Sequence, residues 1–488
     1  MYEISLKNVN FKYNESDHYS LCNINLNVKK GEIVVLCGES GCGKSTVIRL
    51  INGLIPFYYH GELKGEIIVQ NYRAGSGDIY DLGSRVSTVF QNPRSQFYCV
   101  EVRSELAFGA ENMNVPKEQI EKRIEKTTKS MNLEKFLNRT MFQLSGGEKQ
   151  KIACASVSVT DNQVIVLDEP SSNLDVHSIE ELKKMLELWK EQGKTVVIAE
   201  HRLNYLKDIA ERYIFMKKGE IVEEFPADLF NILSTNELNS RGLRSISYRG
   251  IQIQNENISK ERMLLNDFNF KYRKSEVQSL SINELILPEK AVIAVIGHNG
   301  AGKSTFIRNF CGLEKKGRGI LETSGIKLKS RKRLDLSFLV MQDVNHQLFT
   351  ESVSEEIALS CNNYSEEKMD KLLKAFDLEE FKNRHPMSLS GGQKQRVAVA
   401  SAVASDRKFI AFDEPTSGLD YRHMKQVAEY IKTLQNMGKT VFVITHDLEL
   451  IYSCCNYVLH IEGGKVKEQY EMSEENRDRI NKFFKWAE

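Results

Sequence analysis

The sequence predicts an α/β chain of two tandem domains, each a mainly parallel sheet flanked by helices. One glycine-rich motif occurs twice, at residues 38–46 and 297–305, and each copy follows an apolar run and precedes a helix-compatible segment. Strands buried on both faces of a parallel sheet read as continuous apolar runs. Such runs recur in both halves, at 164–167, 195–198, 409–412 and 441–444. At 488 residues the chain also exceeds what one hydrophobic core usually serves.

Matching positions in the two halves keep a common register. The separation is 259 residues for Tyr13 and Tyr272 and for Lys44 and Lys303, and 251 for Gln91 and Gln342. It is 245 for three further pairs, namely Ser145 and Ser390, Asp168 and Asp413, and His201 and His446. The offset therefore changes in two loop-like intervals and nowhere else, as duplicated domains would show.

Each half opens with strand-like alternation, at 4–9 and 264–270, followed by an aromatic-basic-aromatic step. Residues 236–262 are polar, rich in Ser and Asn, and break this pattern. We therefore predict a first domain over 1–235, a linker over 236–262 and a second domain over 263–488.

Composition narrows the class of protein. The chain has 67 Lys and Arg against 66 Asp and Glu, so its net charge of +1 gives no sign of the excess positive charge that nucleic-acid-binding proteins carry. Its nine cysteines include no CxxC pair, as expected in a reducing compartment. We see no signal-peptide pattern and no run of 18 apolar residues. These observations predict a cytosolic protein that can still dock to a membrane partner.

The repeated motif has the form G-x4-G-K-[S/T] and predicts a phosphate-binding P-loop. Its glycines let backbone N–H groups point into one concavity at the positive end of a helix. Lys44 and Lys303 would reach the β- and γ-phosphates, and Ser45 and Ser304 would hold Mg²⁺. A glycine turn beside a lysine is the simpler alternative, but two copies in the same context argue against it. The first half is expected to contact nucleotide through Gly38, Glu39, Ser40, Gly41, Cys42, Gly43, Lys44, Ser45 and Thr46. The second half is expected to use Gly297, His298, Asn299, Gly300, Ala301, Gly302, Lys303, Ser304 and Thr305.

Acidic pairs end one apolar run in each half. Asp168 and Asp413 stand where a carboxylate at the end of a buried strand can hold Mg²⁺. The following residues, Glu169 and Glu414, are placed to polarise the attacking water. An Asp-Glu-Pro sequence could also simply end a strand.

A Leu-Ser-Gly-Gly sequence precedes a helix in each half, 23 residues before Asp168 or Asp413. A serine hydroxyl and bare glycine amides at a helix N-terminus suit an anion, although the same residues also serve as a plain helix cap. With the P-loops, this motif makes the chain resemble two ABC-type ATPase subunits fused head to tail, a likeness that covers nearly the whole chain. The resemblance implies ABC-type P-loop NTPase domains with a small antiparallel β part and a helical signature subdomain, binding ATP and Mg²⁺. It adds nucleotide contacts at Ser145, Gly146, Gly147, Ser390, Gly391 and Gly392.

Further residues take roles by the same resemblance. Gln91 and Gln342 resemble Q-loop glutamines that sense Mg²⁺ and contact a transmembrane partner. His201 and His446 resemble switch histidines that contact the γ-phosphate, and residues 172–175 and 417–420 resemble D-loops. Tyr13 and Tyr272 resemble the aromatic residue that stacks on adenine, although either could pack within a sheet. The implied catalytic set is Gln91, Glu169, His201, Gln342, Glu414 and His446, and the implied metal set is Ser45, Gln91, Asp168, Ser304, Gln342 and Asp413.

In the resembling family the two halves pair, and each nucleotide lies between the P-loop of one half and the signature of the other. The resemblance therefore implies two hydrolysis-competent composite sites, one joining Lys44 to residues 390–392 and one joining Lys303 to residues 145–147. One departure is Glu148, which stands where the other half has Gln393. A carboxylate near the nucleotide could weaken the second of these sites.

Segments 52–56, 91–97, 105–109 and 199–203 resemble the ATPases of energy-coupling factor (ECF) importers. That likeness implies a transmembrane coupling subunit, a substrate-binding membrane subunit and a peripheral location on the cytoplasmic face of the membrane. Phe97, Tyr98, Leu348 and Phe349 are the first choice for the surface that receives membrane-subunit helices, with charge substitutions at Phe97 and Leu348 as its test. The aromatic loop 56–60 could be another partner surface or could pack on its own domain.

Two other classes of tandem ABC protein remain to be weighed. Translation factors that act on ribosomes usually carry a long charged inter-domain helix pair or a Cys-rich iron–sulfur region. This chain has neither pattern, and its net charge is balanced. DNA-repair ATPases need a long coiled coil between P-loop and signature, for which the interval between Lys44 and Ser145 is too short.

Overall fold

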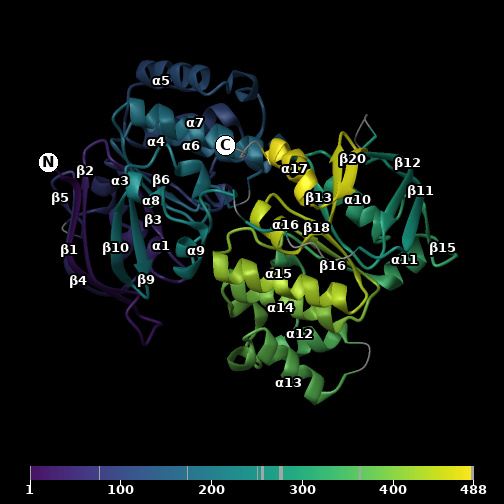
Figure 1. The fold of residues 1–488 in the computed structure, drawn as a ribbon. Coiled ribbons are helices and arrows are strands. Elements are labelled where there is room, and N and C mark those ends of the chain that lie inside the picture. Colours follow the sequence, from purple (N-terminus) through teal and green to yellow (C-terminus); the bar gives the residue numbers. More distant parts are fainter. Residues whose placement is uncertain are drawn as a thin grey trace. The chain divides into compact units, whose positions relative to one another are not determined.

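The computed structural model describes residues 2–75, 77–172, 174–249, 251–253, 258–273, 278–361 and 364–484, without the side chain of Arg94. Its internal contacts divide the chain into two compact units (Figure 1). The first unit is Met1–Ser247 with Asp420–Arg422, and the second is Tyr248–Leu419 with His423–Glu488. Each unit is described separately below.

The first unit contains one antiparallel and one mainly parallel sheet. The antiparallel sheet has the order β2-β1-β4-β5, from β1 (Tyr2–Tyr13), β2 (Leu21–Lys29), β4 (Gly61–Val69) and β5 (Tyr72–Arg73). The second sheet has the order β10-β9-β3-β8-β7-β6, with all neighbours parallel except β9 and β10. Its strands are β3 (Ile33–Cys37), β6 (Val86–Val89), β7 (Val164–Asp168), β8 (Thr195–Ala199), β9 (Arg212–Lys217) and β10 (Glu220–Pro226).

Helices of the first unit follow the strands in the order that a parallel sheet requires. The helix after β3 is α1 (Lys44–Ile51), and the helix between β7 and β8 is α7 (Val176–Glu191). A helical part contains α4 (Val102–Asn112), α5 (Lys117–Ser130) and α6 (Gly146–Thr160), with α4 packed on α6. The remaining helices are short, namely α2 (Leu54–Phe57), α3 (Ile79–Gly83), α8 (Ala227–Phe230) and α9 (Thr235–Ser240).

The second unit repeats this architecture. Its antiparallel sheet has the order β12-β11-β14-β15, from β11 (Arg262–Phe270), β12 (Leu280–Pro288), β14 (Ile320–Thr323) and β15 (Ile326–Leu328). Its larger sheet has the order β16-β17-β18-β13-β19-β20, from β13 (Val292–Ile296), β16 (Ser337–Val340), β17 (Phe409–Asp413), β18 (Thr440–Ile444), β19 (Tyr457–Glu462) and β20 (Lys465–Glu471). Its helices are α10 (Lys303–Phe310), α11 (Ser330–Leu336), α12 (Val353–Ser360), α13 (Glu366–Ala375), α14 (Gly391–Ala404), α15 (Tyr421–Asn436), α16 (Leu448–Cys454) and α17 (Arg477–Phe484).

Apolar runs become central strands because they can be buried on both faces. All five residues of β3 are buried, as are all five of β8, β13 and β18. The predicted α/β architecture is confirmed in both units: each has a mainly parallel sheet, an antiparallel β part and a helical part.

The two changes in repeat offset fall on identifiable elements. Between P-loop and Q-loop, β4 has nine residues whereas β14 has four. Between Q-loop and signature, α5 has 14 residues whereas α13 has ten. The first half is therefore longer where an antiparallel strand and a surface helix extend, and the sheet that carries the site is unchanged.

The predicted linker over 236–262 begins within α9 and ends at the first residue of β11. Residues up to Ser247 cluster with the first unit, and positions 250 and 254–257 lie outside the described residues. The domain boundaries themselves stay a prediction. In the described part of the chain, no helix combines the length and hydropathy needed to cross a bilayer.

Candidate nucleotide site

The first P-loop turns between β3 and α1 through backbone conformations that suit glycine. Gly38 has φ 151°, and a Cβ added there would lie 2.2 Å from the carbonyl oxygen of Met216. Gly43 caps α1 with φ 106°. These conformations, which residues with side chains rarely adopt, curl the loop as a phosphate-binding backbone requires.

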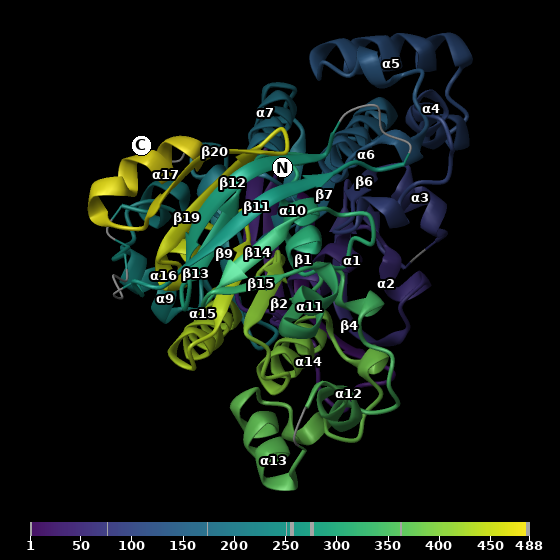
Figure 2. The same cartoon turned by 90° about the vertical axis from the view of Figure 1, so that its right-hand side faces the viewer.

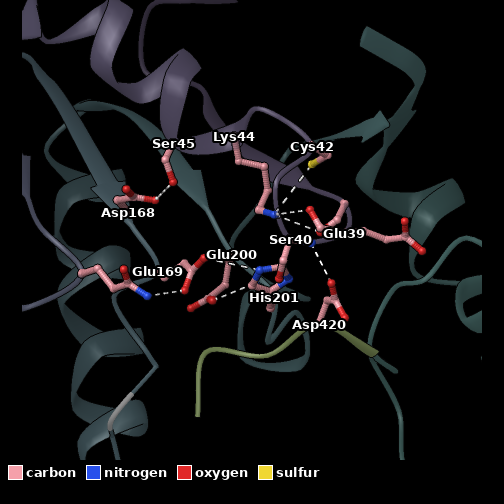
Figure 3. A network of polar contacts seen from close by, with 12 residues as sticks. Glu39, Ser40, Cys42, Lys44, Ser45, Asp168, Glu169, Glu200, His201 and Asp420 are labelled. Carbon is pink, nitrogen blue, oxygen red and sulfur yellow. Dashed lines mark hydrogen bonds and ion pairs between the residues drawn. The ribbon is translucent and has the colours of Figure 1, made fainter. Parts of the chain in front are cut away.

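Lys44 lies inside this loop and is buried. Its Nζ donates hydrogen bonds to the carbonyl oxygens of Gly38 at 2.9 Å and Glu39 at 3.0 Å (Figure 3). The ammonium group is thus fixed at the loop before any phosphate arrives. Ser40 N donates to the carboxylate of Asp420 at 2.7 Å, a residue that clusters with the first unit.

Ser45 and Asp168 form the predicted metal side of the site. Ser45 Oγ donates to Asp168 Oδ1 at 2.9 Å. Burial raises the pKa of Asp168 to about 6, and the nearby charge of Glu169 adds to the effect. A buried carboxylate that charges reluctantly fits a site completed by a cation. No group of three or more His, Cys, Asp or Glu side chains in the described residues could hold a metal. Mg²⁺ at this hydroxyl and carboxylate would therefore take further oxygen ligands from phosphate and water.

Glu169 follows β7 with φ 46°, an uncommon backbone conformation for a residue other than glycine. Its N–H donates to the carbonyl of Ala199 at the end of β8, which brings it beside the next loop. Gln91 Nε2 donates to Glu169 Oε2 at 2.7 Å, and His201 Nε2 lies 3.3 Å from Glu169 Oε1. Burial favours the neutral acid, but the contact with His201 outweighs it and lowers the pKa of Glu169. The structure thus joins three predicted catalytic residues around a carboxylate that stays ionised and can accept a proton.

Glu200 organises the same loops, a role that the sequence did not reveal. Its side chain is 2% exposed. One carboxylate oxygen accepts from Ser171 N at 3.3 Å and Tyr205 Oη at 2.9 Å, and the other accepts from His201 N at 2.8 Å and Arg202 N at 3.4 Å. This carboxylate therefore ties the loop after Glu169 to the loop that carries His201.

The second unit achieves a similar link with a different residue. Position 445, which matches Glu200 in the repeat, is Thr445, and a carboxylate stands two residues later at Asp447. Asp447 Oδ2 accepts from Thr416 Oγ1 at 2.8 Å, and Thr416 is the repeat partner of Ser171. The signal in the sequence was a carboxylate adjacent to each switch histidine, before one and after the other.

The second P-loop has the same geometry as the first, between β13 and α10. Gly297 has φ 151°, and Lys303 Nζ donates to the carbonyl oxygens of Gly297 at 2.7 Å and His298 at 3.1 Å. Lys303 Nζ also lies 3.2 Å from His446 Nε2, and this nitrogen lies 3.4 Å from Glu414 Oε1. Lysine, histidine and glutamate thus meet in one cluster.

The metal side of the second unit differs at its glutamine. Burial raises the pKa of Asp413, while a hydrogen bond with Ser304 opposes the rise. Glu414 has φ 52°, as Glu169 has its own positive φ. Gln342 is exposed and makes no hydrogen bond within the described residues, so the structure does not bring it to Glu414.

Both predicted base-stacking tyrosines lie beside a P-loop helix. Tyr13 Oη lies 3.2 Å from Thr46 Oγ1, and Tyr272 Oη lies 3.2 Å from Thr305 Oγ1. Tyr13 also accepts a hydrogen bond from Arg49, whose guanidinium group lies 4.2 Å from the ring centroid of Tyr59. In the aromatic loop 56–60, Tyr59 therefore packs on its own unit, whereas Tyr58 is 70% exposed.

The two signature serines are helix N-caps. Ser145 N donates to Glu148 Oε2 at 2.7 Å, and Ser390 N donates to Gln393 Oε1 at 2.9 Å, so both helices begin with a capping box. Glu148 and Gln393 therefore make the same capping hydrogen bond despite their different charge. A Cβ added at Gly146 or Gly391 would meet nothing within 4 Å, so both glycines border open space.

Comparisons with known proteins agree with this geometry. The ABC transporter family matches residues 21–172 and 280–417. The chain is 43% identical over 475 residues to an ABC transporter ATP-binding protein of Treponema denticola, covering 96% of each chain. It is 32% identical over 472 residues to a protein of the same description from Sulfurisphaera tokodaii, covering 95% of this chain and 97% of that one.

A solved structure of an archaeal ribosome recycling factor in complex with a ribosomal stalk protein shares the fold. Its TM-score is 0.66 at 21% identity, over 98% of this chain and 92% of that one. With the family match in both halves and a relative 43% identical over nearly the whole chain, the chain belongs to the ABC transporter ATP-binding family and is an ATP-hydrolysing enzyme with two ABC domains.

Proposed function

We propose that this ATPase is the nucleotide-hydrolysing subunit of a membrane importer of the ECF type. The observation that carries the proposal is an exposed aromatic side chain shortly after each Q-loop glutamine. Tyr98 is 76% exposed and stacks on Phe108 with ring centroids 5.1 Å apart, and Phe349 is 72% exposed. Large exposed aromatic side chains are typical of protein–protein contact surfaces.

The proposed contact surface is centred on Tyr98 and Phe349, and not on Phe97 and Leu348, the positions where the sequence suggested charge substitutions. Leu348 is 4% exposed and Phe97 is partly buried, so charge at Leu348 would disrupt packing within the unit. The side chain of Glu356 on α12 accepts hydrogen bonds from Phe349 N and Thr350 N, each at 3.0 Å, and Glu105 on α4 accepts from Tyr98 N and Cys99 N. These buried glutamates fix the two loops on the helical part, which presents Tyr98 and Phe349 to a partner.

Under this proposal the chain is peripheral at the cytoplasmic face and binds a transmembrane coupling subunit and a substrate-binding membrane subunit. The two ABC domains pair, and each nucleotide is shared between the P-loop of one and the signature of the other. The catalytic roles proposed are water activation by Glu169 and Glu414, phosphate contact by His201 and His446, and sensing of the metal by Gln91 and Gln342. Mg²⁺, when bound, would neutralise phosphate charge between Ser45 and Asp168 and between Ser304 and Asp413.

Purification of the tagged chain from its own cells, followed by identification of bound proteins, tests the transport role. We expect two hydrophobic membrane proteins in the wild-type eluate, and their loss from a Tyr98→Asp/Phe349→Asp variant. A matched control, Ile232→Asp/Met437→Asp, places the same charges on other exposed apolar positions and should keep them. Ribosomal proteins in place of membrane proteins would favour a translation factor instead, and equal recovery with both variants would refute the contact surface.

A further inference from the structure

The second unit carries a cluster of exposed cations in the loop after α10 and at the start of α11, beside its antiparallel sheet. Six of them, Lys315, Lys316, Arg318, Lys329, Arg331 and Lys332, form what we name the basic face. All six are exposed and lie in the loop after α10 or at the start of α11. Figure 2 shows β14, β15 and α11 side by side in this part of the unit.

One buried arginine holds these two segments together. Arg333 on α11 is fully buried and donates to the carbonyl oxygens of Phe310, Asn309 and Gly319. Ser330 Oγ donates to the carbonyl of Gly312 at 3.2 Å. The loop with Lys315, Lys316 and Arg318 is therefore fastened to the helix with Arg331 and Lys332, and the six cations share one region of surface.

Little negative charge opposes the basic face. Glu314 pairs with Arg308 at 2.8 Å, and Glu322 pairs with Lys327 at 3.8 Å. Among the described residues, none of the six cations has a carboxylate within ion-pair distance. Asp335 on α11 is an exposed carboxylate in the same segment but forms no ion pair with them, so the segment keeps a net positive charge that favours an external anionic partner.

The repeat provides an internal comparison. Residues 314–341 contain eight Lys and Arg against three Asp and Glu, a net charge of +5. The matching interval of the first half, residues 55–90, contains three against four, a net charge of −1. The shared ATPase architecture therefore does not require this charge, which belongs to the second unit alone.

Apolar side chains are interleaved with the cations. Ile326 is 57% exposed, Leu334 is 43% exposed and Ile320 is 37% exposed. Ile326 begins β15, which packs against α11, and Leu334 lies on α11 two residues after Lys332. Cations beside exposed aliphatic side chains are typical of protein surfaces that lie on an anionic bilayer, whereas binding to a polyanion in solution gains nothing from them.

We propose that the basic face binds the anionic phospholipid headgroups of a membrane surface, with Ile326 and Leu334 entering the interfacial layer. This orients the second unit on the bilayer independently of any protein partner. The inference goes beyond the proposed transport role and is tested on the chain alone. Its failure would leave that role untouched, and an absence of membrane subunits would leave the inference standing.

Vesicle flotation of the purified chain tests the proposal. The probes are vesicles of phosphatidylcholine alone and of phosphatidylcholine with phosphatidylglycerol. We expect binding to the anionic vesicles only, weakened strongly at about 1 M salt, where the Debye length falls to about 3 Å. Each cation near a membrane surface contributes about a fivefold factor in affinity, so Lys329→Gln/Arg331→Gln/Lys332→Gln should lower binding roughly 100-fold.

A matched control uses the exposed helix α5, where cations alternate with acids. Lys117→Gln/Lys122→Gln/Lys126→Gln removes the same charge and should leave vesicle binding within about twofold. Both variants should keep wild-type ATPase turnover, which shows that they fold. Equal loss in both variants, or no binding to anionic vesicles, overturns the proposal.

A second variant separates a bilayer from a soluble polyanion. Ile326→Ser/Leu334→Ser keeps every charge and should lower vesicle binding more than tenfold, because two aliphatic side chains leave the interface. Binding of a short single-stranded RNA is measured beside it. If RNA binds more tightly than the vesicles and the serine variant does not change vesicle binding, the occupant is nucleic acid and the lipid assignment is wrong.

Discussion

Glutamine in place of Glu200 removes a buried negative charge but keeps the size of the side chain. The carboxylate accepts from three backbone N–H groups and from Tyr205 Oη, and it is 2% exposed. An amide retains a single acceptor oxygen, which can serve His201 N and Arg202 N, while its NH₂ group can donate to the tyrosine hydroxyl. Ser171 N is then left without an acceptor in a dry site. Loss of that bond and of the charge assistance to the others should lower the free energy of unfolding by about 2 kcal/mol.

The functional effect follows from the position of Ser171, two residues after Glu169. A loosened loop displaces the Glu169 carboxylate, for which we propose water activation, so kcat should fall roughly tenfold while KM for ATP changes little. Urea unfolding followed by circular dichroism and steady-state ATPase measure the two effects. The exposed Glu220→Gln variant is the matched control and should stay within about 0.5 kcal/mol of wild type. A Glu200→Gln protein with unchanged stability and unchanged kcat would refute the positioning role.

Four further outcomes are expected. The pKa of Asp168 in the folded protein is about 6 against the usual 3.8, so charging it costs about 3 kcal/mol, and stability without metal is lost as pH rises through 6. Asp168→Asn should therefore raise the free energy of unfolding at pH 7.5 by up to about 3 kcal/mol and abolish the stabilisation by Mg²⁺ and nucleotide. Unchanged stability would contradict the predicted sign. Mg²⁺ needs the carboxylate, so Mg²⁺ affinity should fall about tenfold per pH unit below about 6 in a calorimetric titration, and a flat profile would speak against Asp168 as ligand. The Glu169→Gln/Glu414→Gln pair should lose ATPase turnover while still binding nucleotide, and full turnover would exclude both residues as the groups that activate water. Gly38→Ala should cost at least about 2 kcal/mol because its Cβ would lie 2.2 Å from the Met216 carbonyl at a strained φ, whereas Gly83→Ala, whose Cβ meets nothing within 4 Å, should be neutral in the same urea experiment.

The fold and the location of the site could be predicted because few sequences satisfy their constraints. A P-loop needs glycines at fixed positions and a lysine at its end, and the positive φ values at Gly38 and Gly43 show why. Duplication then doubled each signal, so that Asp168 and His201 were identified together with Asp413 and His446. The central strands were predictable for a similar reason, since every residue of β3 and β13 is apolar.

Which side chains of an irregular loop are buried and which are exposed could not be predicted. Leu348 and Phe349 are neighbours in a loop without periodicity, yet one is buried and the other is 72% exposed. Tyr58 and Tyr59 differ in the same way, because Arg49 and Tyr13 hold only Tyr59. The role of Glu200 depends on Ser171, 29 residues earlier, and such a contact exists only once two strands lie side by side.

Nucleotide occlusion measured on the Glu169→Gln/Glu414→Gln background tests the shared sites most directly. A Cβ at Gly146 or Gly391 meets nothing within 4 Å, so aspartate can be introduced there, and the new carboxylate would repel a phosphate at the signature. If Lys44 shares its nucleotide with the signature of the other half, adding Lys44→Ala and Gly391→Asp together should abolish occlusion at one site and leave one nucleotide per chain. Lys44→Ala with Gly146→Asp should then leave none. The reverse pattern, with one nucleotide retained by Lys44→Ala/Gly146→Asp and none by Lys44→Ala/Gly391→Asp, would contradict the composite sites.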